Sequence, residues 1–345
     1  MSKAAYVGID GKARKTLNGY VGVDGVARKV IKGYVGVDGV ARPWLSTPSN
    51  GVGVISTYNR SCGISGATAV AVGTKIYLFG GQLYKSSSYY GSTAIRVFDT
   101  IDETLTKLSA KLPTGVWGTC AVAVGTKIYL LGGNTGTNRY TSSIVVFDTE
   151  TETATTITTT LPYAGKTCAA AVGTKIYMFG FRTATTVNTA IYAFDTETET
   201  IATCKGSVNE YINADNRVNN GFSVVAVGTN VYLFGGSYSE YFATDWYTRC
   251  HSTGIWVYDT VEETKTKLST SLIVNGRKYP FVVGNKAYLF GTTATAVDVF
   301  DFGTNTISTL GTVLPESLGT LFAGVGGKAY FFVGTLQKIF AYSPE

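Results

Sequence analysis

Residues 72–81 read VGTKIYLFGG, and this stretch decides the fold because it recurs along the chain. Close copies are VGTKIYLLGG at 124–133, VGTKIYMFGF at 172–181 and VGTNVYLFGG at 227–236, and looser ones are VGNKAYLFG at 283–291 and VGGKAYFFVG at 325–334. The second residue of every copy is a glycine, and neighbouring glycines lie 42 to 56 residues apart, at Gly73, Gly125, Gly173, Gly228, Gly284 and Gly326. Six copies of a unit of this length indicate a repeat architecture.

Each unit has the same internal order, and every part of it is typical of a short β-strand. A strand of small residues such as TAVAV comes first, a Val-Gly-Thr turn leads into KIYLFGG, and a loop of variable length follows. A third strand ends in an aromatic residue and an acid, as in RVFDT, and a polar turn precedes a Thr-rich strand such as ETLTKL. Four short strands in succession predict an antiparallel meander. Because one such sheet cannot bury both of its faces alone, we expect the units to pack radially.

The repeat resembles that of kelch-repeat β-propellers, over residues 51–345. Pairs of glycines match the kelch doublet at Gly80-Gly81, Gly132-Gly133 and Gly235-Gly236. Aromatic residues stand where kelch units carry theirs, at Tyr77, Tyr129, Tyr177 and Tyr232. The tryptophan of the kelch fourth strand is absent. The resemblance implies an all-β, six-bladed kelch-like β-propeller. Since the sixth unit ends after its third strand, we expect residues 52–56 to supply the missing strand and close the ring.

A different repeat precedes the propeller and divides the chain into residues 1–46 and 47–345. Its units, AYVGIDGKARKTLN, GYVGVDGVARKVIK and GYVGVDGVARPWLS, have a period of 14 residues. An Asp-Gly pair between two alternating segments predicts a β-hairpin, so we expect a small module of tandem hairpins. The module carries eight basic and three acidic residues, which account for +5 of the net charge of +6. A module of this size has a marginal core of its own, which favours anchoring to a partner or to further copies of the chain.

The YVGVDGVARK motif resembles short N-terminal repeats of minor structural proteins of phages and prophages, in tails or fibres. This resemblance implies a virion protein, made in the cytoplasm of a bacterial host, whose N-terminal repeats bind other virion proteins or form a homo-oligomer. Its propeller would then bind a glycan or protein of the host surface. The basic residues recur once per hairpin beside the same turn, with no aromatic stacking platform, so nucleic acid is not expected as a partner.

The composition argues against membrane insertion, a disulfide framework and a metal site. No run approaches the roughly 20 apolar residues that span a membrane, and the start of the chain lacks the apolar core of a signal peptide, so no membrane insertion is expected. Five cysteines without a CxxC pair do not indicate a disulfide framework or zinc site. Cys120 and Cys168 occupy equivalent first-strand positions, where we expect small buried thiols. The single histidine, His251, leaves no multi-histidine metal cluster, and no cofactor is expected.

The candidate binding face follows from strand direction. The turns that follow the first and third strands are short and uniform, whereas the loops after the second strands and the links between units vary in length and share the opposite face. Aromatic and arginine residues gather in these variable loops, and such residues dominate binding hot spots. The ligand-binding candidates are Tyr84, Tyr89, Tyr90, Trp117, Arg139, Tyr140, Arg182, Arg217, Tyr241, Trp246, Tyr247 and Arg249.

Three classes of function remain open from the sequence. The first is the virion protein that binds the host surface, and the second is a cytoplasmic kelch module that grips a protein partner. The third is a carbohydrate-active enzyme, for which the loops at 206–221 and 237–254 offer carboxylates such as Glu210 and Asp245. No nucleophile elbow and no Asp-box turn is present, so we predict that the chain is not an enzyme.

Overall fold

The computed structural model of the chain describes a set of ranges separated by short gaps. These ranges are 6–9, 12–15, 20–23, 26–29, 33–37, 40–44, 52–57, 64–85, 87–183, 187–208, 222–242, 246–273, 276–291, 296–313, 321–333 and 338–344. Before residue 64 and over 237–251, the description covers the backbone only. Every element in these ranges is a β-strand, as the alternating and β-branched segments predicted.

The strands before residue 52 pair as three two-stranded antiparallel units with an Asp-Gly pair between the strands of each. They are β1 (Tyr6–Ile9) with β2 (Lys12–Lys15), β3 (Tyr20–Val23) with β4 (Val26–Lys29), and β5 (Gly33–Val37) with β6 (Val40–Trp44).

The remaining strands form antiparallel meanders in chain order. The first contains β8 (Thr68–Val72), β9 (Lys75–Phe79), β11 (Ser88–Asp99) and β12 (Thr104–Val116). The second contains β13 (Cys120–Val124), β14 (Lys127–Leu131), β17 (Ser143–Asp148) and β18 (Thr153–Thr160). The third contains β19 (Lys166–Val172), β20 (Lys175–Arg182), β21 (Val187–Asp195) and β22 (Thr200–Ser207).

The fourth meander contains β23 (Ser223–Val227), β24 (Asn230–Phe242), β26 (Gly254–Asp259) and β27 (Thr264–Ser271). The fifth contains β28 (Gly276–Val283), β29 (Lys286–Gly291), β30 (Ala296–Asp301) and β31 (Thr306–Val313). The last contains β32 (Phe322–Val325), β33 (Lys328–Val333) and β34 (Lys338–Tyr342), to which β7 (Val52–Thr57) pairs. Four further strands extend the loops: β10 (Gln82–Lys85), β15 (Asn134–Gly136), β16 (Arg139–Tyr140) and β25 (Trp246–His251).

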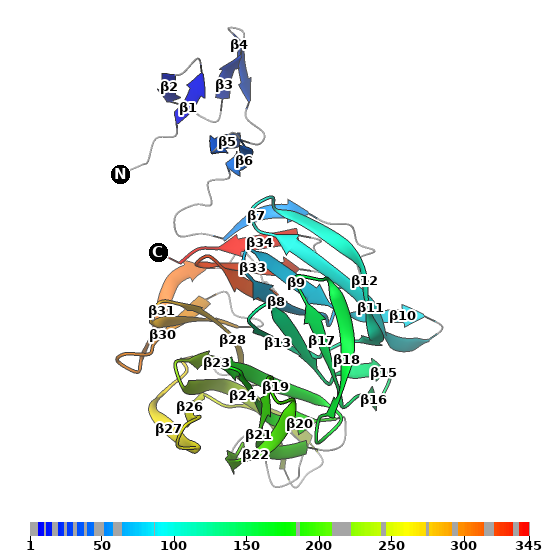
Figure 1. Ribbon diagram of the computed structural model, residues 1–345. Helices are drawn as coiled ribbons and strands as arrows, with labels where there is room; N and C mark the ends of the chain where they lie inside the picture. The colour runs from blue at the N-terminus through cyan, green and yellow to red at the C-terminus, as the bar shows by residue number, and fades with distance from the viewer. Residues whose placement is uncertain are drawn as a thin grey trace.

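The meanders stand around a common axis, which makes the fold an all-β propeller (Figure 1). The first strand of each meander contacts the first strand of the next, in the order β8, β13, β19, β23, β28 and β32, and β32 returns to β8. These strands are built largely of small residues, because bulky side chains would collide where strands converge on the axis. The described residues of β8 are all half-buried, as expected for a strand that lines a central channel.

Hydrogen bonds join the strands of the propeller into five sheets, so the expectation of six separate sheets was wrong. The cause lies between the fourth and fifth meanders, where β24 continues past its glycine doublet. Gly235 and Gly236 pair there with Arg277 and Gly276 of β28, and the two meanders become one nine-stranded sheet. Doublet glycines permit such close approach because they have no side chain and adopt positive φ, 66° and 128° at this place.

The N-terminal and C-terminal parts of the chain meet in the last sheet. β7 pairs antiparallel with β34, and Val52 lies opposite Tyr342 while Thr57 lies opposite Lys338. β7 therefore occupies the outer position of that sheet, which is where residues 52–56 were expected. The two strands are 286 residues apart when counted from Val52 to Lys338 (338 − 52).

Two recurring turns explain why the repeat is so visible in the sequence. The glycine of each Val-Gly-Thr turn has φ of 59° or 60°, and the equivalent glycines of the last two units have 57°. A two-residue hairpin that begins with positive φ favours glycine there. The aspartate that ends each third strand, up to the fifth meander, caps the second turn. In the second meander, Asp148 Oδ1 accepts hydrogen bonds from the backbone N–H of Glu150 at 2.9 Å and of Thr151 at 3.1 Å. These acids are therefore turn residues.

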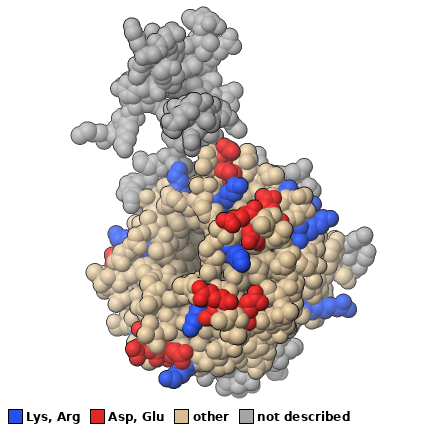
Figure 2. Space-filling model, in the orientation of Figure 1, with Lys and Arg blue, Asp and Glu red and all other residues tan. Residues whose placement is uncertain are grey.

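The hydrophobic core consists of layers between neighbouring meanders. Aromatic rings meet edge to face in these layers, for example Phe79 with Phe147 at 5.4 Å and Phe234 with Phe300 at 5.5 Å between ring centroids. On the face seen in Figure 2, basic side chains lie next to acidic ones rather than in one continuous basic area.

Candidate functional site

A pocket of about 500 Å³ opens where the first strands begin, which is the end of the propeller that carries the variable loops. The first strands end at the Val-Gly-Thr turns, so the pocket lies at the opposite end of the axis from those turns. Five meanders contribute the start of their first strand or the residues just before it, at 66–69, 117–121, 166–169, 222–224 and 321–322, and the fifth meander contributes the middle of β28, at 279–280. No single repeat contains the site.

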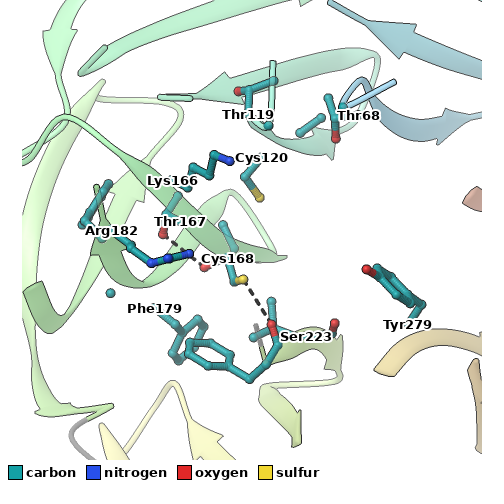
Figure 3. Close-up of a pocket in the computed structure, with 18 of the residues that line it drawn as sticks. Thr68, Thr119, Cys120, Lys166, Thr167, Cys168, Phe179, Arg182, Ser223 and Tyr279 are labelled. Carbon is teal, nitrogen blue, oxygen red and sulfur yellow. Dashed lines mark hydrogen bonds between the residues drawn. The ribbon is translucent and has the colours of Figure 1, made fainter. Parts of the chain in front are cut away.

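Two cations form one side of the pocket. Lys166 opens β19 and Arg182 ends β20, and the two residues are partners in the strand register. Paired residues project to the same face of a sheet, and Figure 3 shows both side chains on the same side of the pocket. Burial lowers the pKa of the Arg182 guanidinium below its ordinary value, and Tyr140 nearby acts in the opposite direction. Because arginine ordinarily titrates above about pH 12, the guanidinium remains charged at neutral pH.

Gly118 provides the space that Lys166 occupies. Its φ is +59°, and a Cβ placed on it would lie 2.8 Å from Cε and 3.0 Å from Nζ of Lys166. A side chain at position 118 would therefore be strained and would also push the ammonium group out of its place. The backbone N–H of Gly118 donates to the carbonyl of Gly66 at 2.7 Å, which ties the first and second meanders together at the rim.

The other walls of the pocket are aromatic and apolar. Tyr279 lies across the pocket from the two cations (Figure 3), and Phe222 and Phe322 also line it. Rings contact one another there, with Tyr279 and Phe322 edge to face at 5.8 Å between centroids. None of the described residues that line the pocket is acidic. The arrangement therefore suits a ligand that carries a negative group on a body with an apolar face.

Two thiols line the same pocket. Cys120 and Cys168 are half-buried thiols, which corrects the expectation of buried thiols at these positions. The reason is that the first strands line the channel rather than the core between meanders. The thiol of Cys168 donates to the carbonyl of Phe222 at 3.3 Å, across to the fourth meander (Figure 3).

The structure brings some of the candidate residues from the sequence into the pocket and leaves others on the rim. Trp117 and Arg182 line the pocket, although Trp117 is only 8% exposed, whereas an exposed ring was expected. Its backbone forms a bridge with Asn134 of the neighbouring loop.

Outside the pocket, the rings of Tyr84, Tyr89 and Tyr90 are exposed, Arg139 is exposed and Tyr140 is half-buried.

The remaining candidates belong to the longest loops. Arg217 lies outside the described residues. The backbone of β24 and β25 is described, with Tyr241 opposite Tyr247 and Ser239 opposite Arg249, but the side chains of Tyr241, Trp246, Tyr247 and Arg249 are not. The loop carboxylates Glu210 and Asp245 also lie outside the described residues.

Sequence reasoning missed Lys166 and assigned no binding role to Cys120 and Cys168. One signal could have found them: they stand at the start of first strands, and in the propeller this end of the first strand faces the variable loops. Among the described residues, no group of three or more His, Cys, Asp and Glu side chains is placed to hold a metal ion. No helix long and apolar enough to cross a membrane occurs in the described ranges.

Fold and site together define a β-propeller with a pocket at its loop-side end. Comparison with known families agrees: residues 66–291 match the family model described as the KLHDC2/KLHL20/DRC7 Kelch-repeats domain. The chain belongs to this family of Kelch-repeat domains, which are generally interaction modules without catalytic activity. The match begins just before β8 and ends with β29.

A solved structure, that of YjhT, is similar to this chain in fold. It is 15% identical, the similarity covers 71% of this chain and 83% of that one, and the TM-score is 0.58. No curated protein matches the chain in sequence.

Proposed function

We propose that the propeller binds a ligand with an anionic group at its loop-side pocket. The observation that carries this proposal is the paired placement of Lys166 and Arg182 on one wall, opposite aromatic rings, with no acid among the described lining residues. A partly desolvated guanidinium binds carboxylate or phosphate oxygens in two parallel hydrogen bonds. The aromatic walls provide apolar surface for the rest of the ligand.

The biological setting we propose is a phage or prophage virion. The N-terminal repeats would attach the chain to other virion proteins or to further copies of itself, and the propeller would bind a glycan or protein on the surface of the host. This part of the proposal is supported by the resemblance of the YVGVDGVARK motif to repeats of phage structural proteins. It is also supported by the aromatic residues of the variable loops, because rings in loops on a rigid scaffold commonly form binding surfaces.

We further propose that the ring works as six blades. The nine-stranded sheet would count as two of them, because each of its meanders contributes its own first strand to the channel. The sixth blade would be the sheet of β32, β33, β34 and β7, and this unit lies outside the range that matches the family model.

A second candidate function is a cytoplasmic module that binds a protein partner. Membership in the Kelch-repeat family favours it, since such domains are generally protein-interaction modules. The two candidates make different demands: the virion protein must occur in purified particles, and the cytoplasmic module must bind an intracellular protein of its host.

The pocket is tested by measuring binding of the purified full chain to arrays of acidic and neutral glycans and to intact host cells. We expect Arg182→Ala and Lys166→Ala to weaken binding at least tenfold. The matched control is Lys107→Ala, which removes an exposed cation from the outer strand β12, far from the pocket lining. Equal binding by all four proteins would refute the role of the pocket. Mass spectrometry of purified particles tests the setting, and absence of the chain from them would refute it.

A further inference from the structure

A tyrosine-rich hairpin stands on the loop side of the first meander. β10 pairs with the beginning of β11, so that Tyr84 lies opposite Tyr89 and Leu83 lies opposite Tyr90. The three tyrosines are 64%, 46% and 39% exposed, in the order Tyr84, Tyr89 and Tyr90. They make up most of the exposed rings among the described residues, where the other is Tyr163. A cluster of exposed rings on one short hairpin indicates a binding function rather than chance.

The two opposed rings are held in place without a ligand. Opposed residues project from the same face of a hairpin, and the ring centroids of Tyr84 and Tyr89 are 4.9 Å apart with an interplanar angle of 51°. The hairpin is tied to the neighbouring loop, because Tyr90 pairs with Gly136 of β15 and the Tyr89 N–H donates to the Thr137 hydroxyl at 3.4 Å. β10, β11, β15 and β16 thus form one small sheet from two different meanders.

The base of this hairpin is part of the pocket rim. The N–H of Gln82, the first residue of β10, donates to the carbonyl of Ser65 at 2.7 Å, next to the pocket residue Gly66. A Cβ placed on Gly66 would lie 3.4 Å from the ring of Trp117 and 3.8 Å from Cβ of Gln82. The pocket wall and the start of the hairpin are therefore adjacent, and a chain-like ligand can continue from one to the other.

We propose that Tyr84 and Tyr89 form a second subsite for an acidic oligosaccharide whose charged end unit occupies the pocket. This inference rests on the pocket function proposed above and names the ligand class: a glycan chain. The C–H face of a pyranose ring packs on an aromatic ring, and its hydroxyls bond to hydroxyl groups nearby. The hairpin offers this combination, since Ser87 and Ser88 adjoin the tyrosines and are exposed. The basic pocket matches an acidic end unit in charge.

A protein partner fits this surface less well. A stable protein interface buries about 800 Å² on each partner around an apolar centre. On this hairpin, the one aliphatic side chain with a described environment, Leu83, is half-buried rather than exposed. Rings and hydroxyls without an aliphatic centre favour a sugar chain, which needs a narrow track instead of a broad patch.

The test uses the full chain on an array that carries uronic, sialic and phosphorylated sugars, each as a single unit and as chains of two to six units. Four proteins are compared: the natural chain, the double variant Tyr84→Ala/Tyr89→Ala, the ring-preserving control Tyr84→Phe/Tyr89→Phe, and Arg182→Ala. We expect one acidic chain to bind the natural protein at least tenfold more tightly than its single unit does. The double alanine variant should lose that gain while it binds the single unit unchanged, and the phenylalanine control should keep most of the gain.

The outcomes separate this inference from the function it rests on. If single acidic units bind and depend on Arg182, but longer chains bind no better or keep their advantage in the double alanine variant, the second subsite is refuted and the pocket stands. If no acidic glycan binds, the glycan subsite is refuted, and if the natural chain and Arg182→Ala also bind intact host cells equally, the pocket function is refuted as well. Thermal unfolding of the double variant, together with its single-unit binding, reports whether the propeller is intact.

Discussion

A buried ion pair within the fifth meander, on the face that packs against the fourth, gives the sharpest prediction for stability. Lys278 of β28 and Asp298 of β30 lie 2.8 Å apart between Nζ and Oδ2, and each side chain is 1% exposed. The second carboxylate oxygen accepts a hydrogen bond from the Thr309 hydroxyl at 2.8 Å. Asp298 projects to the same face of its strand as Phe300, which packs against Tyr232 and Phe234 of the fourth meander. The pair thus lies in the layer beside the backbone bridge between β24 and β28.

Removal of one partner leaves the other charge buried without its counterion, which costs about 3–5 kcal/mol in comparable sites. Asp298→Ala should cost this amount, because the ammonium of Lys278 has almost no access to water. A domain is stable by about 5–15 kcal/mol in total, so the variant would lose a large part of its stability. The double variant Lys278→Met/Asp298→Leu removes both charges, and comparable apolar replacements are neutral or stabilising. In this double variant the Thr309 hydroxyl loses the Asp298 carboxylate as its acceptor, and water can replace it because Thr309 is exposed.

The assay is equilibrium unfolding in urea, with the midpoint and slope measured for the single variants Asp298→Ala and Lys278→Met and for the double variant. Lys107→Met, which changes an exposed lysine on β12, serves as the control and should shift stability by less than about 0.5 kcal/mol. We expect each single variant to be far less stable than the double variant. If Asp298→Ala costs less than about 1 kcal/mol, or if the double variant is as unstable as the singles, then the pair is hydrated and the reasoning is refuted.

Three further predictions concern closure, turns and thiols. Deletion of residues 1–46 should leave the melting temperature by circular dichroism unchanged, whereas deletion of 1–57 should lower it, because β34 loses its partner β7; equal melting of both would contradict this. The pKa of Asp148 is lowered by the backbone N–H groups of Thr151 and Glu150. The ionised carboxylate therefore stabilises the folded protein above the unfolded pKa of 3.8, and this contribution is lost as the pH falls through the lower pKa of the folded state. Asp148→Ala should therefore differ from the natural chain in urea midpoint at pH 7 and lose that difference in acid, and a pH-independent difference would contradict this. Burial raises the pKa of the Cys204 thiol, so N-ethylmaleimide should modify the half-buried Cys168 before it modifies Cys204. Peptide mass spectra report the order of modification, and the reverse order would show that the pocket is closed.

Much of the fold could be predicted because its turns are determined by residues that are close together in the sequence. The glycine of each Val-Gly-Thr turn must adopt positive φ, and the aspartate after each third strand must cap its own turn, so both residues recur in nearly every unit. The period of these residues reveals the strand order and the direction of each strand. Direction also assigned the loops to a face, and so Tyr84 and Arg182 were found as candidates.

The pocket and the number of hydrogen-bonded sheets depend on contacts between residues of different repeats, which the preferences of single turns and strands do not predict. The sequence by itself determined the repeat, the strand order and the face that carries the loops, because each follows from turns a few residues long. Only the tertiary structure placed Lys166 in the space over Gly118, set Tyr279 opposite it, and joined β24 to β28. The physical reason is distance along the chain: these groups belong to different repeats, and they meet only when the first strands converge on one axis and the ring returns to its start.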